Sequence, residues 1–212
     1  VRRLDAAVVS HGDNDHAGGF AGVARVFPPG WTAVPPGRGA QAGIAGRACI
    51  AGMQWQWDGV EFRFLHPARS FPYLENESSC VLRIEAHGHA ALLPGDIGEV
   101  VERMLVQDQA AMLEAEVVLV PHHGSAGGSQ PGFVAATGPD WALVSAGYRN
   151  RFGHPKAEVV ARWRDAGAAV VGTAESGAQR ILLGEAGVEF AGERALRRRL
   201  WDSVAASAVP AR

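Results

Sequence analysis

The chain has 212 residues, of which 47% are hydrophobic and 20% charged, and its formal net charge is −2. Such a composition is typical of a globular domain with a buried core. The near-neutral charge gives no bulk electrostatic reason to expect a nucleic acid or an anionic membrane as partner, although an enzyme can bind phosphate through metal ions. The sequence has no apolar stretch of membrane-spanning length and no signal-peptide pattern at its start.

The first half of the chain is predicted to be rich in strands. Apolar and polar residues alternate about Asp58-Gly59, which predicts one β-hairpin, and a second hairpin is expected to turn at residues 87–89. Gly, Pro and Ala dominate the segment between the first helix and these hairpins, so loop is expected there. In order, we expect a buried strand over 4–10, a short helix over 17–27, loop with at most one short strand over 28–52, and hairpins over 55–66 and over 80–86 with 90–93.

The second half alternates strand with helix. The expected elements are a helix over 99–113, a strand over 117–120, a helix over 132–137, a strand over 141–145, a helix over 156–166, and closing strands over 168–173 and 180–183. Hairpins followed by such alternation indicate sheets flanked by helices. We assign residues 1–190 to one domain and residues 191–212 to a C-terminal helix and tail.

Two features of the chain leave alternatives open. Val1 stands where translation normally places Met, and an interior-type strand follows at once. A truncated chain, a processed chain or an excised fragment would each explain this, and we expect the front of the domain to be missing. Cys49 and Cys80 can be two free thiols or one disulfide, and the apolar strand around Cys80 favours a buried thiol.

Metal-binding side chains crowd into one short loop after the first predicted strand. His11, Asp13, Asp15 and His16 all lie in it. Imidazole nitrogens and carboxylate oxygens are common ligands of divalent metals, and two acids this close are costly unless a cation or water compensates them. The alternative is a polar surface loop that happens to contain two histidines.

Further donors stand at or just after the ends of other predicted strands, where an α/β scaffold places its chemistry. They are Asp96, the pair His122-His123, and His154. For His66, and for His87 and His89 at the predicted hairpin tip, we expect a structural or exposed role. The six tryptophans are expected to pack in the core or on the surface, because no basic residues are interleaved with them.

Five phrases carry a family resemblance. They are residues 10–19 (SHGDNDHAGG), 76–84 (NESSCVLRI), 93–97 (LPGDI), 120–125 (VPHHGS) and 150–155 (NRFGHP). Together they resemble the metallo-β-lactamase superfamily, and within it the C-terminal domain of ComEC-type competence proteins, which take up DNA. The resemblance implies an α/β fold, the αββα sandwich with metals at the sheet edge, here without its first strands.

Two positions depart from the superfamily pattern. Asp13 replaces the second histidine of the usual first motif, as is common in the ComEC-like branch. Asn76 stands near the place where the superfamily supplies a histidine, and Asn is a much weaker metal ligand.

Seven donors then divide over two divalent ions, zinc or manganese. We expect His11, Asp13 and His122 on one ion, Asp15, His16 and His154 on the other, and Asp96 as the bridge. Two ions roughly 3.5–4 Å apart can deprotonate a water between them and stabilise the charge that develops on a phosphoryl or acyl centre. With three carboxylates the site is hard enough for manganese to compete with zinc.

The paired histidines need separate roles. Neighbours on an extended segment point to opposite sides, so His122 and His123 are not expected to bind the same ion. We expect His122 to be the ligand, and His123 to be a proton donor to the leaving oxygen, an outer neighbour of a ligand, or a structural residue. Asp15 and His123 are thus the candidate catalytic residues.

Candidate substrate contacts lie close to the donors in sequence. They are Ser125, Asn76 and Arg151, with Arg149 and Ser79 as further possibilities. For each arginine the alternative is a solvated loop charge.

The donors predict a two-metal hydrolase that needs no serine or cysteine nucleophile. The resemblance implies a phosphodiesterase or nuclease acting on DNA during competence-related uptake, with DNA and the membrane channel portion of the parent protein as partners. It also implies that the parent lies in the bacterial inner membrane, and it leaves open on which side this domain works. The alternatives are a hydrolase of small esters, such as choline phosphodiesters, and an inactive fragment of the channel protein.

Overall fold

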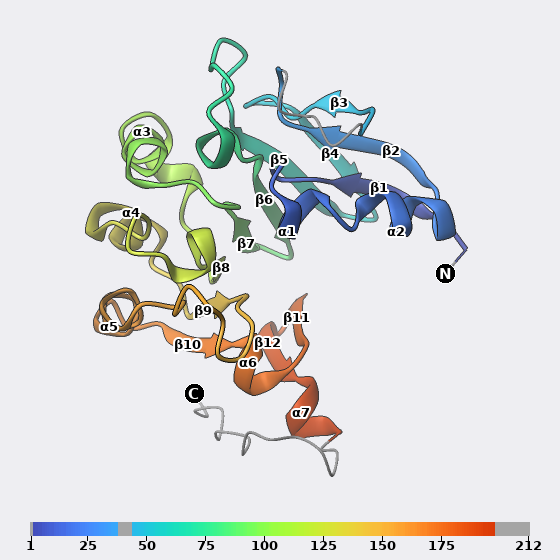
Figure 1. The fold of residues 1–212 in the computed structure, drawn as a ribbon. Coiled ribbons are helices and arrows are strands. Elements are labelled where there is room, and N and C mark those ends of the chain that lie inside the picture. Colours follow the sequence, from blue (N-terminus) through green and yellow to red (C-terminus); the bar gives the residue numbers. More distant parts are fainter. Residues whose placement is uncertain (1, 38–43, 198–212) are drawn as a thin grey trace.

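The computed structural model describes residues 2–37 and 44–197, which form three sheets with helices on their outer sides (Figure 1). The largest sheet has seven strands in the order β10-β9-β8-β7-β6-β5-β4, parallel from β10 to β7 and antiparallel from β7 to β4. Its strands are β4 (Gln54–Trp57), β5 (Val60–His66), β6 (Val81–Ala86), β7 (His89–Leu93), β8 (Val117–Leu119), β9 (Trp141–Val144) and β10 (Ala169–Gly172).

Two smaller sheets cover one face of the large sheet. The first is parallel and contains β1 (Leu4–Val8), β2 (Pro29–Val34) and β3 (Arg47–Ala48), and the second is the antiparallel hairpin of β11 (Gln179–Gly184) and β12 (Gly187–Gly192). Alternate residues of the large sheet point to this face, because side chains along a strand alternate in direction. Phe64 and Leu82 pack beneath the first small sheet, and Trp141 stacks on Phe190 of the second.

Helices cover the other face of the large sheet. They are α3 (Glu99–Gln109), α4 (Pro131–Thr137) and α5 (Ala157–Asp165), and Figure 1 shows them side by side along that face. Leu92, Val118 and Val144 of the sheet pack in the same apolar core as Leu105 of α3 and Trp163 of α5. Burial of such side chains stabilises the fold by about 1.5–3 kcal/mol each.

Short helices flank the two small sheets. α1 (Asn14–Ala17) and α2 (Phe20–Val26) lie beside β1 and β2, and α6 (Thr173–Ser176) and α7 (Glu193–Leu196) lie beside the β11-β12 hairpin. Helices therefore lie outside two sheet layers that pack face to face. This arrangement confirms the predicted αββα sandwich.

The sequence predicted most elements and misplaced a few. The helix expected over 17–27 corresponds to α2, which begins at Phe20, and the additional short helix α1 precedes it across Gly18-Gly19. The segment 28–52 contains two strands, β2 and β3, and residues 38–43 within it lie outside the described residues. The strand β12 was not predicted, although its residues alternate in character.

The expectation of a buried thiol at Cys80 is wrong. Cys49 and Cys80 form a disulfide, with their Cα atoms 5.9 Å apart. Cys49 follows β3 and Cys80 precedes β6, so the bond joins the three-stranded sheet to the large sheet. Sequence alone could not show this contact, because the two cysteines are 31 residues apart and meet only when the sheets pack.

The assignment of residues 1–190 and 191–212 to separate parts stays a prediction. β12 runs through residue 190, and the tail residues 198–212 lie outside the described part of the chain. Among the described residues, no helix combines the length and the apolar character that crossing a membrane requires.

Candidate metal centre

The candidate donors meet where four strands end. β7, β8 and β9 are parallel neighbours, so their carboxyl ends open at one edge of the large sheet. Asp96 follows β7, the pair His122-His123 follows β8, and His11 follows β1 of the small sheet. Asp15 and His16 lie on α1, which begins just after His11.

Asp96 faces imidazoles from both halves of the chain. Its side chain is buried, with Oδ1 3.3 Å from Nε2 of His16 and Oδ2 3.3 Å from Nε2 of His123. The two Nε2 atoms are themselves 3.2 Å apart. Two nitrogens that bind one tetrahedral ion at bond lengths of 2.0–2.1 Å lie about 3.3 Å from each other. The spacing of these donors therefore fits a single ion between them.

Hydrogen bonds at the opposite ring nitrogen orient two of these imidazoles. Nδ1 of His123 lies 2.8 Å from the backbone carbonyl oxygen of Ser145, which can only accept, so Nδ1 carries a proton and Nε2 is directed at the carboxylates. Nδ1 of His16 lies 3.0 Å from Oγ of Ser10. Histidines that bind metals usually have their other nitrogen held in this way.

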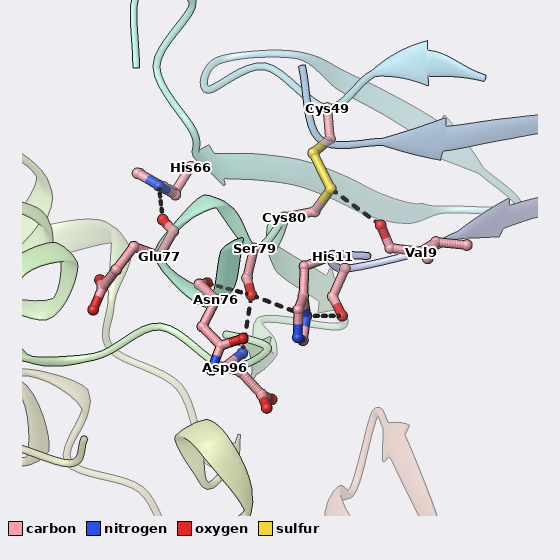
Figure 2. Close-up of a disulfide and its surroundings, with 10 residues drawn as sticks. Val9, His11, Cys49, His66, Asn76, Glu77, Ser79, Cys80 and Asp96 are labelled. Atoms are coloured by element: carbon pink, nitrogen blue, oxygen red, sulfur yellow. Dashed lines mark hydrogen bonds between the residues drawn. A yellow bond between two sulfur atoms is a disulfide. The ribbon is translucent and has the colours of Figure 1, made fainter. Parts of the chain in front are cut away.

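The surroundings of His11 fit a metal-binding imidazole. Ser79 donates its hydroxyl proton to the carbonyl oxygen of Asn76 at 2.7 Å, so it accepts from the backbone N–H of Asp96 at 3.0 Å and from Nδ1 of His11 at 3.4 Å (Figure 2). Nε2 of His11 is then a lone-pair donor, and it is buried with no hydrogen-bond partner in residues 2–37 or 44–197. An unsatisfied buried polar atom costs about 1–3 kcal/mol, and a bound cation removes that cost.

The remaining predicted donors surround this centre. Oδ2 of Asp13 lies 3.7 Å from Nε2 of His11, and Nε2 of His122 lies 4.0 Å from Oδ2 of Asp96. The ring of His154 lies 6.1 Å from that of His122, centroid to centroid. Nδ2 of Asn76 lies 3.4 Å from Nε2 of His122. The structure thus brings all seven predicted donors to one edge of the sheet.

The tightest donor sets differ from the division expected from the sequence. Ligand atoms of His11, His16 and Asp96 lie within 4.8 Å of one another, as do those of Asp15, His16 and His123. His16 belongs to both sets, and His123 takes part in one. The residue types fit a divalent metal, because imidazole nitrogen and carboxylate oxygen are the usual ligands of zinc and manganese.

The backbone of the paired histidines is not extended, as the sequence interpretation assumed. His122 has φ 49° and His123 has φ 56°, both in the left-handed region. Each such residue costs about 1–2 kcal/mol and persists only where the surroundings hold it. Gly95 accepts a hydrogen bond from His122 N–H at 3.1 Å, and Gly124, itself at φ 83°, has no room for a Cβ, which would lie 2.5 Å from Pro155. This turn lets both imidazoles approach Asp96.

The carboxylate and the imidazoles of the cluster shift one another's pKa values. Burial opposes ionisation of Asp96, but hydrogen bonds from His123 and His16 hold its pKa well below the usual range. The hydrogen bond to Asp96 raises the pKa of His123 to about 9, whereas burial lowers the pKa of His11. The two imidazoles differ because Asp96 stabilises the charged form of His123, whereas burial outweighs the effect of Asp96 at His11.

The predicted substrate residues lie at the rim. Asn76 stands beside His122, and its Oδ1 is buried without a hydrogen-bond partner within the described segments. Ser125 ends the turn of the paired histidines, with its backbone N–H donating to the carbonyl oxygen of His122 at 2.9 Å. Arg149 and Arg151 are exposed on the loop that leads to His154.

The histidines left out of the site are placed as expected. His66 is buried, with its Nε2 2.8 Å from the carbonyl oxygen of Glu77, and His89 pairs with Glu116 at 3.1 Å. Two residues that orient ligands, Ser10 and Ser145, were not singled out. Ser10 directly precedes His11 within the first quoted phrase, so the sequence carried a signal there, but the role of a backbone carbonyl such as that of Ser145 leaves no trace in side-chain patterns.

A family model supports what the geometry indicates. The model described as the metallo-beta-lactamase superfamily matches residues 1–148. The chain belongs to the metallo-β-lactamase superfamily. Members of this superfamily are generally metal-dependent hydrolases.

Relatives narrow the branch of the superfamily. The chain is 39% identical over 193 residues to competence protein ComA of Neisseria gonorrhoeae, covering 89% of this chain and 27% of that protein. It is 30% identical over 178 residues to recombination protein 2 of Haemophilus influenzae, covering 84% and 22%. The predicted ComEC-type relationship is confirmed, and the chain spans about a quarter of the length of these relatives.

Solved structures show the same metallo-β-lactamase fold. CmlA from Streptomyces venezuelae, a diiron β-hydroxylase, superposes with a TM-score of 0.57 at 14% sequence identity, covering 80% of this chain and 44% of CmlA. At this identity the likeness shows the fold alone.

Proposed function

We propose that this metallo-β-lactamase domain is a two-metal phosphodiesterase that hydrolyses DNA. The observation that carries the proposal is the convergence of His11, His16, His123 and both oxygens of Asp96, with Nε2 of His11 buried and unsatisfied within the described residues. Two divalent ions in such a site lower the pKa of water to near neutrality and stabilise the charge that develops on a phosphodiester.

The side chains of the cluster have separate tasks in this proposal. Asp96 would be the ligand shared by both ions, because it groups with His11 and His16 while its Oδ2 also approaches His122 and His123. The further ligands would be His11, Asp13, Asp15, His16, His122 and His154. Ser79 and Ser10 orient imidazoles and bind no ion themselves.

His123 has two roles open to it. Nε2 of His123 lies 3.4 Å from Oδ2 of Asp15, at the outer side of the cluster, where it could donate a proton to a leaving oxygen. The same Nε2 lies close enough to Nε2 of His16 and to the carboxylate of Asp96 to share a metal ion with them. The backbone carbonyl of Ser145 accepts a hydrogen bond from Nδ1, which is the usual arrangement in a metal-binding histidine. The geometry favours the ligand role more than the sequence did.

The substrate assignment rests on the names of the relatives. Two relatives are, by name, a competence protein and a recombination protein, and both words concern DNA. CmlA is, by name, a diiron enzyme, which supports a two-metal centre in this fold. We also propose the membrane channel portion of a longer parent protein as a partner, with that parent in the bacterial inner membrane.

The disulfide helps to assign the side of the membrane on which the domain lies. Disulfides persist in oxidising compartments and are rare in the cytosol. The Cys49–Cys80 bond therefore supports a position on the outer side of the inner membrane. Alkylation of both cysteines in protein extracted without reductant would contradict this placement.

The test is metal analysis combined with hydrolysis assays on the purified chain. Elemental analysis of protein loaded with Zn²⁺ or Mn²⁺ and then dialysed should give close to two ions per chain. The loaded protein should cleave a labelled single-stranded oligonucleotide and bis(p-nitrophenyl) phosphate, and EDTA should abolish both activities. Hydrolysis of a choline phosphodiester with no cleavage of DNA would favour the small-ester alternative, and metal binding without any hydrolysis would overturn the proposed function.

A further inference from the structure

A basic and aromatic loop borders the metal centre and includes the predicted ligand His154. Residues 147–156 connect β9 to α5 and form one wall of a groove of about 480 Å³. The groove is lined by Tyr148, Asn150 and Phe152 of this loop, and also by Asp15 and His123 of the donor cluster. Whatever lies along the loop is therefore in reach of the metal centre.

Two aromatic rings of this loop are exposed. The exposed fraction is 51% for Tyr148 and 57% for Phe152. Among the described residues, Trp57 is the one other aromatic side chain that is comparably exposed, at 38%, and it lies on the distant edge strand β4. Two exposed rings at the mouth of a groove that reaches the donor cluster indicate a binding surface.

Arginines accompany both rings. Cζ of Arg149 lies 5.2 Å from the ring centroid of Tyr148, and Cζ of Arg151 lies 4.7 Å from that of Phe152. The ring of Phe152 also stacks on that of His154, with the centroids 5.7 Å apart, so a base on Phe152 would extend a stack that begins at the metal centre. Neither guanidinium has a carboxylate partner within the described residues. The loop also carries Lys156 and no acidic residue, in a chain whose net charge is −2.

The loop is held in one conformation. Nδ2 of Asn150 donates to the carbonyl oxygens of Gly147 at 3.0 Å and His154 at 2.6 Å, and Oδ1 of Asn150 accepts from His154 N–H at 3.0 Å. Nζ of Lys156 donates to the carbonyl oxygen of Phe152 at 2.8 Å. The rings and arginines are therefore presented by a preorganised loop, which lowers the entropy cost of binding.

Rings interleaved with cations match the chemistry of a polynucleotide with unpaired bases. Aromatic rings stack on the flat faces of bases, and guanidinium groups bind the phosphates between them. A duplex hides those base faces, and a choline ester has none. We infer that residues 147–156 hold single-stranded DNA, with bases on Tyr148 and Phe152 and phosphates on Arg149 and Arg151. This inference rests on the proposed nuclease function and specifies its substrate.

Binding without hydrolysis provides the test. The probes are fluorescein-labelled dT12, an abasic strand of the same length and charge, and a duplex, each measured by fluorescence anisotropy in EDTA. Tyr148→Ala and Phe152→Ala should each weaken dT12 binding by about 5- to 100-fold and leave the abasic strand within about 2-fold, because stacking contributes roughly 1–3 kcal/mol per base. Arg149→Ala and Arg151→Ala should weaken both strands and reduce the salt dependence of binding by about one phosphate contact each.

Matched variants separate stacking from general damage. Tyr148→Phe and Phe152→Tyr retain the rings and should bind dT12 like the unmodified chain. Trp57→Ala and Arg103→Ala remove an exposed ring and an exposed cation elsewhere and should have no effect on binding.

The outcomes distinguish this inference from the proposed function. A chain that cleaves DNA but binds dT12 equally with and without the two rings overturns the inference alone. Duplex binding as tight as dT12 binding, and insensitive to Tyr148→Ala, also overturns it. A chain that hydrolyses no phosphodiester yet shows the predicted ring dependence supports the binding surface while the nuclease proposal fails.

Discussion

The loop that carries His11 and His16 is tied to its surroundings by side chains, whereas the turn that carries His122 and His123 is tied by its backbone. On the first side, the hydroxyls of Ser10 and Ser79 hold the imidazoles, and the Cys49–Cys80 disulfide anchors the strand next to Ser79. On the second side, left-handed residues, backbone hydrogen bonds and Pro155 fix the turn.

The difference predicts which changes destabilise the loop of His11 and His16 and which destabilise the turn of His122 and His123. The first side depends on a covalent bond and on hydroxyl groups, so it is sensitive to reduction and to single side-chain changes. The second side depends on conformations that cost energy locally and are stabilised by packing against Pro155 and the strand ends. Asp96 is the buried carboxylate at which the two sides meet, with one oxygen facing His16 and the other facing His123.

The largest effect is expected from Asp96→Ala, which removes the link between the two sides. Loss of a shared ligand should weaken both metal sites by more than about 10²-fold, which exceeds the effect of losing an outer hydrogen-bond partner. Hydrolysis should fall by at least about 10³-fold, because charge stabilisation and water activation are lost together. Asp108→Ala, at an exposed position on α3, is the matched control. Full metal content with normal activity in Asp96→Ala would rule out a shared carboxylate.

Substitutions of His122 and His123 test the turn that carries them, without changing the loop of His11 and His16. If His122 is a ligand, His122→Ala should lower metal content and activity together. If His123 protonates the leaving oxygen, His123→Ala should retain metal and slow DNA cleavage by about 10²–10⁴-fold, with a smaller loss on bis(p-nitrophenyl) phosphate, whose leaving group needs no proton. Metal loss in His123→Ala would instead assign that residue as a ligand, as its approach to His16 and Asp96 favours.

The sequence predicted the loop of His11 and His16 better than the turn of His122 and His123. His11, Asp13, Asp15 and His16 are close in sequence, so their proximity in space followed from the spacing itself. The αββα arrangement could also be predicted, because the periodicities of hairpins and helices are local signals and five short motifs resemble those of the superfamily.

The remainder depended on contacts that form only in the folded chain. The left-handed turn at His122 and His123 is hydrogen-bonded to Gly95 and packs through Gly124 against Pro155. Both contacts are with residues far away in sequence, and no propensity of histidine indicates the turn. The disulfide was missed for the same reason, since Cys49 and Cys80 meet across two packed sheets. The rings of Tyr148 and Phe152 were not predicted, because the sequence does not indicate which aromatic side chains remain exposed in the folded chain.

Removal of the disulfide tests the loop that carries His11 and His16. Replacing both cysteines, as in Cys49→Ala with Cys80→Ala, should lower the free energy of unfolding by about 3–4 kcal/mol, the loop-closure value for 31 residues. Urea denaturation measures this loss. Hydrogen exchange should accelerate around residues 8–19 and remain unchanged around 145–156. Equal acceleration on both sides would show that the two sides are not held independently.

The smallest change in the free energy of unfolding, about 3 kcal/mol at most, is expected from the titration of His66, which holds the turn that carries Asn76. His66 is buried, and its Nε2–H donates to the carbonyl oxygen of Glu77 in that turn (Figure 2). Burial lowers the pKa of His66 from 6.5 to about 4, against the opposing effect of the Glu77 hydrogen bond. The unfolded chain therefore binds a proton at pH values at which the folded chain does not.

The sign of the effect follows from this difference in proton binding. The contribution of neutral His66 to stability is fully present above pH 6.5 and is lost as the pH falls from 6.5 to about 4. Urea unfolding of the metal-free chain should show this loss between pH 7.5 and 4.5. In His66→Gln, which retains a donor for Glu77 but does not titrate, the unfolding free energy should fall less steeply, by about one proton. Parallel pH profiles for the two proteins would mean that His66 does not stay neutral in the folded chain, and that the turn beside the metal centre is held by something other than this buried imidazole.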